Sequence, residues 1–275
     1  MSSVSCLEAH LATFPSVLVG FSGGVDSSLV AVAARRALGR DHAIAAIGVS
    51  PSLASNQYEQ AVGIANQFDL ALLEVETREF EQPAYVANAP DRCYHCKHEL
   101  WQVLTDVARA RELAAVCDGT NADDGSDHRP GARAGQEFAV HSPLADLGYT
   151  KDQVRREAQA LGIPVWDAPA APCLSSRVMY GLEVRPDRLR QVEASESLLH
   201  ELGIEGDVRV RHRGDEARIE VIPSQFDQVR AHRARIAARF RELGFRRVTL
   251  DLNGYERGSL LTRPDERVEP LMDPI

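Results

Sequence analysis

Short apolar runs along this chain alternate with longer segments in which apolar residues recur at helical spacing. The short runs are rich in Val, Ile, Leu and Ala and are bounded by glycine or polar residues, which predicts buried strands. These strands are expected at residues 17–20, 43–50, 71–76, 114–118 and 138–141. Helices are expected between them, at residues 26–39, 55–68, 97–112 and 150–161. Strands that alternate with helices predict a doubly wound parallel sheet of the α/β class.

The pattern changes after an irregular, proline-containing stretch at residues 165–181. Beyond it the pattern predicts a helix, a β-hairpin, a second helix and a last strand. Their expected positions are 186–202, 207–213 with 216–222, 224–243 and 246–252. This order is typical of a small α+β domain. We therefore expect two domains, at residues 1–182 and 183–275.

The composition is that of a globular protein. The chain has 275 residues, of which 44% are hydrophobic, so it can bury a large core. No apolar run reaches the roughly 18 residues that a membrane-spanning helix needs. The first 20 residues lack the cationic segment of a signal peptide, and five cysteines, an odd number, do not suggest a disulfide framework. We expect a cytoplasmic protein with no membrane partner.

The net charge of −9 is unevenly distributed along the chain. Residues 1–184 hold 14 lysines and arginines against 23 carboxylates, whereas residues 185–247 hold 14 arginines against 11 carboxylates. The chain has only two lysines, Lys97 and Lys151, and 29 arginines. The overall negative charge disfavours nucleic acid as a partner, because phosphate contacts dominate that affinity. The basic section is either a solvated surface or a site for smaller phosphates.

The strand at 17–20 runs through Ser22, Gly23 and Gly24 into a helix, a geometry that favours anion binding. Free backbone N–H groups and the positive end of the helix dipole lie at such a turn. Glycines let a phosphate approach the backbone closely. The loop lacks the GK[ST] of a Walker A motif. The pattern SGGVDS, which ends with Asp26 and Ser27, is similar to the PP-loop of the ATP pyrophosphatase superfamily.

A second polar loop follows the strand predicted at 114–118. It begins with Asp118, Gly119, Thr120 and Asn121 and continues with further carboxylates. Gly119 permits a sharp turn, and the polar side chains suit hydroxyl groups, an adenine edge or Mg²⁺. Because ligands bind at the carboxyl ends of parallel strands, this loop and the SGGVDS loop are expected at one site. The alternative is an ordinary Asx-rich turn.

Three cysteines are candidates for metal binding or redox chemistry. Cys93 and Cys96 form a CxxC pair at the start of a predicted helix, and Cys173 follows in the segment CLSSR. A CxxC pair is compatible with a redox pair, half a zinc site or iron–sulfur ligation. Arg177 lies close in sequence to Cys173 and would favour its thiolate. The remaining two, Cys6 and Cys117, are expected to be packing residues.

Arg209, Arg211 and Arg213 alternate along a predicted strand and therefore share one face of it. Their guanidinium groups suit phosphate recognition. We expect one or more of them to bind a substrate phosphate. The alternative is a solvated face.

Taken in order, these motifs extend over residues 15–262 and resemble the LarE family of ATP-dependent sulfur-inserting enzymes. The matching segments are SGGVDS (22–27), PDRCYHCK (90–97), DGTNADD (118–124), RPG (129–131), SPL (142–144), CLSSR with YG (173–177 and 180–181), VRVRHRGDEARIE (208–220) and DLNGYERGS (251–259). The resemblance implies a PP-loop domain of the adenine nucleotide α-hydrolase-like type. It also implies a homo-oligomer, of which a hexamer is one form.

The activity that the resemblance implies is a step in biosynthesis of the nickel-pincer nucleotide cofactor. ATP activates a carboxylate of pyridinium-3,5-dicarboxylate mononucleotide, and sulfur then converts it to a thiocarboxylate, at both carboxylates. Asp26 would be the carboxylate on the Mg²⁺ side, and Ser22, Gly23, Gly24 and Ser27 would hold the pyrophosphate portion of ATP. The 118–121 loop would complete the nucleotide site. Ser176 and Arg177 would join Arg209 and Arg211 at the small nucleotide substrate.

The family resemblance leaves two sulfur sources. In members with three cysteines, Cys93, Cys96 and Cys173 would hold a [4Fe–4S] cluster, with one iron open for sulfide from an external donor. In members with a single cysteine, the residue equivalent to Cys173 gives up its own sulfur. The three-cysteine pattern favours the cluster; a zinc or redox role is a further alternative.

Three other functions fit part of the pattern. A PP-loop enzyme that thiolates tRNA would explain the cysteines but calls for a strongly basic surface. An amide-forming ligase of the NAD- or GMP-synthetase type would not need the three cysteines. A nucleotide or iron–sulfur sensor would bind without turning over ATP.

Overall fold

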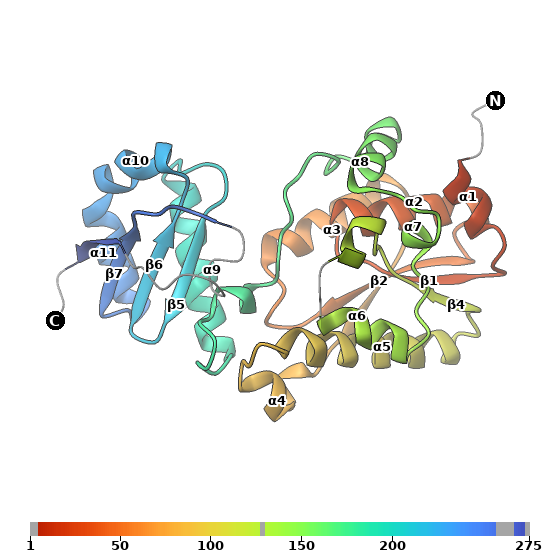
Figure 1. Cartoon of the computed structure of the whole chain (residues 1–275), viewed down its shortest axis with the longest axis horizontal. Coiled ribbons are helices and arrows are strands. Elements are labelled where there is room, and N and C mark those ends of the chain that lie inside the picture. Colours follow the sequence, from red (N-terminus) through yellow and green to blue (C-terminus); the bar gives the residue numbers. More distant parts are fainter. Residues whose placement is uncertain (1–4, 127–129, 257–266, 273–275) are drawn as a thin grey trace. The chain divides into compact units, whose positions relative to one another are not determined.

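The structure of this protein is a computed structural model that describes residues 5–126, 130–256 and 267–272. The chain forms two compact units (Figure 1). The first holds the described residues up to Gln82 together with Asp91–Pro172, and the second holds Pro83–Pro90 and the described residues from Cys173 onward. None of the described helices is long and apolar enough to cross a membrane.

The boundaries of these units differ from the expected division into 1–182 and 183–275. The segment that follows Cys173 pairs with the second unit, where Val178 forms a β-bridge with His212. The buried side-chain amide of Asn88 donates to the carbonyls of Val178, Met179 and Leu182, at 2.9–3.3 Å. Long-range hydrogen bonds therefore assign both segments to the second unit, although the sequence places the 83–90 segment inside the first.

The first unit contains a parallel four-stranded sheet, which confirms the predicted α/β class. The strands are β1 (Val17–Gly20), β2 (Ala43–Val49), β3 (Ala71–Glu76) and β4 (Ala115–Cys117), in the spatial order β3-β2-β1-β4. Central β1 pairs with β2 through Leu18 and Ile44 and with β4 through Leu18 and Val116. The expected strand at 138–141 is absent among the described residues; only a bridge between His141 and Cys117 remains there.

Helices cover both faces of this sheet, as a doubly wound fold requires. Figure 1 shows α2 (Val25–Leu38) and α8 (Lys151–Ala160) on one side and α5 (Arg92–Ala110) and α6 (Pro130–Glu137) on the other. Successive residues of β1 face opposite sides of the sheet, so both sides are apolar and are covered by helices. Val17 and Val19 pack in the core on one side, and Leu18 packs with Trp101 in the core on the other. The remaining helical elements are α1 (Cys6–Leu11), α3 (Ser55–Gln67), η1 (Glu79–Glu81), η2 (Ala122–Ser126) and α7 (Pro143–Asp146).

The helix expected at 97–112 begins five residues earlier than predicted, at Arg92. The segment before Lys97 has few apolar residues, so hydrophobic spacing does not mark the helix start. Cys93 and Cys96 therefore lie on the first turns of α5, in agreement with the expectation that the CxxC pair lies at the start of a helix.

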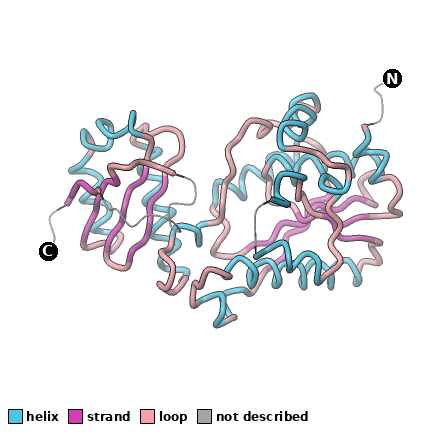
Figure 2. The backbone as a smooth tube through the Cα atoms, viewed as in Figure 1, coloured by secondary structure: helices cyan, strands magenta, loops and turns pink. Residues whose placement is uncertain are grey.

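The second unit is a smaller α+β structure, as the pattern predicted (Figure 2). Its sheet has the order β5-β6-β7-β8, with β6 and β7 parallel and the outer pairs antiparallel. The bounds are β5 (Arg209–Arg213), β6 (Glu216–Glu220), β7 (Arg247–Asp251) and β8 (Val268–Met272). The helices are α4 (Pro83–Val86), η3 (Leu174–Arg177), α9 (Pro186–Glu201), η4 (Pro223–Gln225), α10 (Phe226–Ala231) and α11 (Arg233–Glu242).

Two features of this unit differ from the prediction. The single helix expected at 224–243 is divided into η4, α10 and α11, with the break at His232. The edge strand β8 was not predicted, because Pro270 interrupts its apolar pattern; it pairs with β7 across an irregular register at Val248 and Thr249.

Candidate nucleotide site

The loop between β1 and α2 is held by contacts among its own residues. The backbone N–H of Ser22 donates to the Ser27 hydroxyl at 3.2 Å, and the two hydroxyl oxygens are 3.1 Å apart. Gly23 has a φ of +72°, and a Cβ there would lie 2.9 Å from the backbone of Ala61. Gly24 caps α2 without any side-chain hydrogen bond to the first turn. The N-terminus of this 14-residue helix therefore has the geometry that favours anion binding.

The loop that follows β4 lies directly against the first turn of α2. A Cβ on Gly119 would lie 2.6 Å from the backbone nitrogen of Ser27 and 2.9 Å from the carbonyl carbon of Asp26. Thr120 donates to both carboxylate oxygens of Asp118, through its backbone N–H at 3.0 Å and its hydroxyl at 2.6 Å. The structure thus brings the two predicted loops together at one edge of the sheet.

Asp26 is a junction between three segments of the first unit. The side-chain amide of the buried Asn121 donates to its Oδ1 at 3.1 Å. The ammonium of Lys151, at the start of α8, donates to its Oδ2. The motif analysis assigned Asp26 and Asn121 to the site but gave no role to Lys151. The two residues lie 125 positions apart in the sequence, so no local pattern indicates that they pair. The scarcity of lysine in the chain is the sequence signal that could have indicated a role for Lys151.

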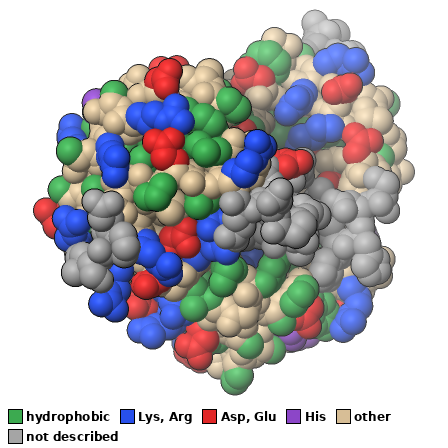
Figure 3. Space-filling view, turned by 60° about the vertical axis from the view of Figure 1, so that its left-hand side comes forward, with side chains coloured by type: hydrophobic (Ala, Val, Ile, Leu, Met, Phe, Trp, Pro, Cys, Tyr) green, Lys and Arg blue, Asp and Glu red, His purple; other side chains and the backbone are tan. Residues whose placement is uncertain are grey.

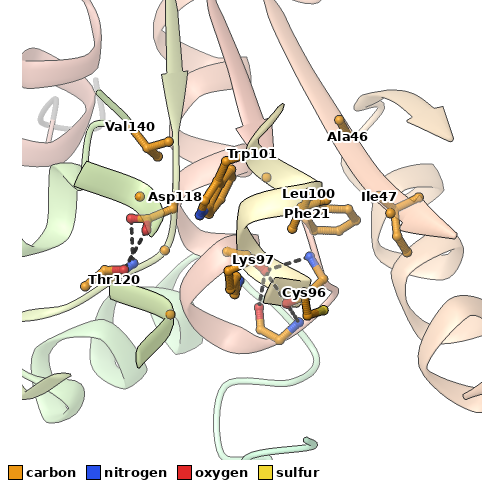
Figure 4. Close-up of a pocket in the computed structure, with 18 of the residues that line it drawn as sticks. Phe21, Ala46, Ile47, Cys96, Lys97, Leu100, Trp101, Asp118, Thr120 and Val140 are labelled. Atoms are coloured by element: carbon orange, nitrogen blue, oxygen red, sulfur yellow. Dashed lines mark hydrogen bonds between the residues drawn. The ribbon is translucent and has the colours of Figure 1, made fainter. Parts of the chain in front are cut away.

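A cavity of about 770 Å³ opens between these loops and α5 (Figure 4). Seven of the predicted nucleotide-site residues and the CxxC pair line it: Ser22, Gly24, Asp26, Ser27, Asp118, Gly119, Thr120, Cys93 and Cys96. In Figure 4, Trp101 lies between Asp118 on one side and Phe21 and Leu100 on the other. The cavity is thus polar at the two loops and apolar along α5 and the inner strands.

A buried acidic group lines the same cavity beyond the ends of β2 and β3. Glu79 is 1% exposed, and its Oε1 accepts hydrogen bonds from the hydroxyls of Ser50, at 2.5 Å, and Ser52, at 3.1 Å. Its Oε2 has no hydrogen-bond partner among the described residues. The motif analysis missed this group, since the three residues belong to no recognisable motif.

The five cysteines form no disulfide and lie in different environments. Cys93 is exposed and Cys96 half-buried at the cavity, whereas Cys173 belongs to the second unit. Cys117 is fully buried, as expected, and burial raises the pKa of its thiol to about 12. Cys6 is exposed, so the prediction that it packs in the core was wrong: it is the first residue of α1, whose buried face is formed by Leu7 and Leu11.

The structure bears on a metal site in two ways. Among the residues described, no group of three or more His, Cys, Asp or Glu side chains is arranged to hold a metal ion. Mg²⁺ at nucleotide sites usually takes only one or two carboxylates and is otherwise bound by phosphates and water. Asp26 at the PP-loop fits that requirement. Cys93 and Cys96, accessible thiols one helical turn apart, fit two of the ligands of an iron–sulfur cluster.

The second unit brings the CLSSR segment against β5. Arg177 is 6% exposed and pairs with Glu196 through two hydrogen bonds of 3.1 and 3.2 Å. It also donates to the carbonyl of Cys173 at 3.1 Å. Arg211 pairs with the buried Glu220 and donates to the carbonyl of Ser176 at 3.1 Å. The four predicted substrate residues, which are Ser176, Arg177, Arg209 and Arg211, therefore gather within one unit.

The strand arginines are not a solvated face. Arg209 and Arg211 are 9% and 7% exposed, while Arg213 is half-buried. Burial, and then the nearby Arg177 guanidinium, lower the pKa of Arg209 from its ordinary value. An anion bound beside Arg209 and Arg177 would offset both effects. On the molecular face drawn in Figure 3, basic and acidic side chains are interspersed and do not form separate regions of one charge sign.

Comparisons with known proteins identify relatives that match most of this chain. Residues 5–111 match the family model of NAD synthase. An uncharacterised protein of Synechocystis is 42% identical, over 94% of this chain and 97% of its own length. The pyridinium-3,5-bisthiocarboxylic acid mononucleotide synthase of Lactiplantibacillus plantarum is 35% identical, over 92% of each chain. An uncharacterised protein of Methanocaldococcus jannaschii is 28% identical over 87% of this chain and 90% of its own length.

The comparisons and the motifs lead to the same family. Arg129 of RPG and residues 257–259 of DLNGYERGS lie outside the described residues. Among the other segments, SGGVDS, PDRCYHCK and DGTNADD contribute residues to the lining of the cavity, and CLSSR contacts the strand segment VRVRHRGDEARIE in the second unit. With a near full-length relative at 35% identity, this chain belongs to the LarE family of PP-loop, ATP-using enzymes.

Proposed function

We propose that this protein catalyses ATP-dependent sulfur insertion into pyridinium-3,5-dicarboxylate mononucleotide. A substrate carboxylate oxygen attacks the α-phosphorus of ATP, the bond to the β-phosphate oxygen breaks, and pyrophosphate leaves. Sulfide then attacks the acyl carbon of the adenylate and AMP leaves with the original oxygen, which gives a thiocarboxylate. The same two steps at the second carboxylate complete the product. The observation that carries the proposal is the convergence of the PP-loop with the 118–121 loop in a chain 35% identical to the named synthase.

The PP-loop residues have separate roles in this proposal. Ser22, Gly23, Gly24 and Ser27 bind the β- and γ-phosphates at the N-terminus of α2, where the helix dipole favours negative charge. Asp26 is the carboxylate for Mg²⁺. Asp118, Gly119, Thr120 and Asn121 hold the nucleotide from the opposite loop. The cavity of about 770 Å³ is large enough for ATP.

For the sulfur source we propose Cys93, Cys96 and Cys173 as the three ligands of a [4Fe–4S] cluster. When bound, such a cluster supplies one iron without a protein ligand, where sulfide from an external donor is held. Accessible thiols at the cavity support the role of Cys93 and Cys96. Donation of the Cys173 sulfur itself is the alternative.

The experiment that tests the function is turnover of purified protein with ATP, Mg²⁺, the pyridinium dicarboxylate nucleotide and sulfide under anaerobic conditions. We expect AMP and pyrophosphate to form only when the nucleotide substrate is present, and mass spectrometry to show exchange of oxygen for sulfur at its carboxylates. AMP formation with tRNA in place of the pyridinium nucleotide, or no ATP turnover with either, would reject the proposal. Light scattering of the same preparation tests the proposed homo-oligomer, with a hexamer as one form.

We propose that Ser176, Arg177, Arg209 and Arg211 bind the phosphate of the pyridinium substrate, and Arg209 offers the clearest test. Arg209→Gln is expected to raise the KM for this substrate by about tenfold or more, because a hydrogen bond to a charged phosphate is lost. ATP affinity is expected to remain unchanged. The matched control is the exposed Arg246→Gln. An unchanged KM in Arg209→Gln would contradict a role for this residue at the phosphate.

Arg211→Gln is less informative than the Arg209 variant. It would remove the Arg211 guanidinium from the carboxylate of Glu220, which is 4% exposed. Breaking such a buried pair costs about 3–5 kcal/mol of unfolding free energy. A defect in that variant would therefore reflect folding as well as binding.

A further inference from the structure

Glu79 is a buried carboxylate that lines the cavity of the first unit with one of its two oxygens unpaired. The side chain belongs to a residue that is only 1% exposed. Its Oε1 accepts hydrogen bonds from the hydroxyls of Ser50 and Ser52. Its Oε2 has no hydrogen-bond partner among the residues that the structure describes. Because a buried polar atom is costly unless it is paired, Oε2 needs a donor from a bound ligand.

The two serines fix the position of this carboxylate. The backbone N–H of Ser52 donates to the Ser50 hydroxyl oxygen at 3.2 Å, and the two hydroxyl oxygens are 2.9 Å apart. The segments that follow β2 and β3 are also joined, since the N–H of Thr77 donates to the carbonyl of Val49 at 3.2 Å. Two hydroxyl donors already occupy Oε1, so the site presents Oε2 as one preorganised acceptor.

The position of Glu79 in the sheet indicates which part of a nucleotide it meets. The strand order is β3-β2-β1-β4; the PP-loop follows β1 and Glu79 follows β3. Strands β1 and β3 are separated by two sheet spacings, or about 10 Å. The phosphates and the base are the two ends of a nucleotide. A nucleotide with its phosphates at the PP-loop can therefore extend across the end of β2 and place its base near Glu79.

The cavity wall across this distance is apolar. Phe21, Ala46 and Ile47 line it, and Figure 4 shows Ile47 on the far side of Phe21 from Asp118. Apolar surfaces of this kind suit the faces of an aromatic base better than the hydroxyl groups of a ribose. A single acceptor beside such a wall matches one N–H donor on the edge of a base.

We propose that Glu79, held by Ser50 and Ser52, accepts a hydrogen bond from the exocyclic amine of adenine and thereby selects ATP. Adenine carries an amine at C6, whereas guanine and hypoxanthine carry a carbonyl oxygen there. That oxygen would place a second acceptor against Oε2 and leave both atoms unpaired. The inference rests on the proposed function, for which it names the residue that distinguishes the nucleotide.

The test measures the affinity of the intact protein for the magnesium complexes of ATP, ITP and purine riboside triphosphate, by titration calorimetry. ITP has a carbonyl oxygen in place of the adenine amine, and purine riboside triphosphate has only a hydrogen there. We expect the unaltered protein to bind ATP about tenfold or more tightly than either analogue, as for a hydrogen bond to a charged group. This comparison uses no variant and so does not depend on the folding of one.

Two substitutions then identify the residue that reads the base. The amide of Glu79→Gln can donate to a carbonyl oxygen, so we expect the ratio of ATP to ITP affinity to fall by about tenfold or more. Glu79→Ala has no acceptor and is expected to bind ATP and purine riboside triphosphate equally. Glu81→Gln is the matched control, because Glu81 is exposed on the same helical turn η1. It should keep the original preference, and thermal unfolding checks that each variant is folded.

Three results would overturn the inference. Equal affinity of the unaltered protein for ATP and ITP would mean that no group reads the C6 position. A preference for ATP that persists in folded Glu79→Ala would assign this reading to another residue. A preference for ATP over 2′-deoxy-ATP or 3′-deoxy-ATP that Glu79→Ala abolishes would mean that the carboxylate binds a ribose hydroxyl instead. None of these ligands contains the pyridinium substrate, so failure of the sulfur-insertion proposal would leave the binding pattern unchanged.

Discussion

Alanine in place of Cys93, Cys96 or Cys173 is expected to abolish sulfur transfer and to leave ATP binding intact. Each substitution removes a thiolate ligand of the proposed cluster, and thiolates hold such clusters in proteins. In the proposed site, PP-loop backbone groups and Ser27 bind the phosphates, and none of the three thiols belongs to that loop. The result would be binding of ATP without formation of a thiocarboxylate.

The measurements are iron and acid-labile sulfide after anaerobic reconstitution, the visible absorbance, and thiocarboxylate formation. Cys6→Ala is the matched control, because Cys6 is exposed and does not line the cavity. It should retain iron and activity. Near-zero iron in the unaltered protein, with conversion of Cys173 to dehydroalanine detected by mass spectrometry after turnover, would reject the cluster in favour of the sacrificial mechanism.

Gly119→Ala is expected to lower ATP-dependent AMP formation by about two orders of magnitude or more. Its Cβ would lie 2.6 Å from the backbone nitrogen of Ser27, a rigid neighbour in the first turn of α2. The two loops must separate to admit it, which moves the PP-loop from its phosphate-binding geometry; displacements of about 1 Å can cost about 100-fold in rate. Overpacking of this kind also costs on the order of 1–3 kcal/mol of unfolding free energy.

Turnover assays and thermal unfolding of this variant separate the two effects, since activity is measured well below the unfolding temperature. Gly63→Ala is the matched control: it lies inside α3, and a Cβ there meets no atom within 4 Å. That variant should be as active as the original and as stable or slightly more stable. Normal AMP formation by a folded Gly119→Ala protein would show that close contact of the two loops is not required.

The sequence predicted those features that local pattern determines. Short apolar runs bounded by glycine or polar residues indicate strands, so β1, β2 and β3 were located close to their observed bounds. The turn from β1 into α2 depends on adjacent residues and was predicted from SGGVDS alone. The sequence did not distinguish the roles of the glycines: the backbone of Ala61 lies against Gly23, whereas a Cβ on Gly24 would approach only the Ser22 hydroxyl, at 3.5 Å.

Other features depend on contacts between distant residues, which no local pattern encodes. The pairing of Lys151 with Asp26 joins residues 125 positions apart. The alternation of Arg209 and Arg211 showed that they share a face, but partners from other segments decide that the face is buried and that Glu220 neutralises Arg211. The segment at 83–90 joins the second unit because Asn88 binds three carbonyls beyond residue 177. The sequence by itself thus determined the fold class and the phosphate loop, because neighbouring residues form both. The tertiary structure decided which charges meet, because burial and long-range hydrogen bonds select those pairs.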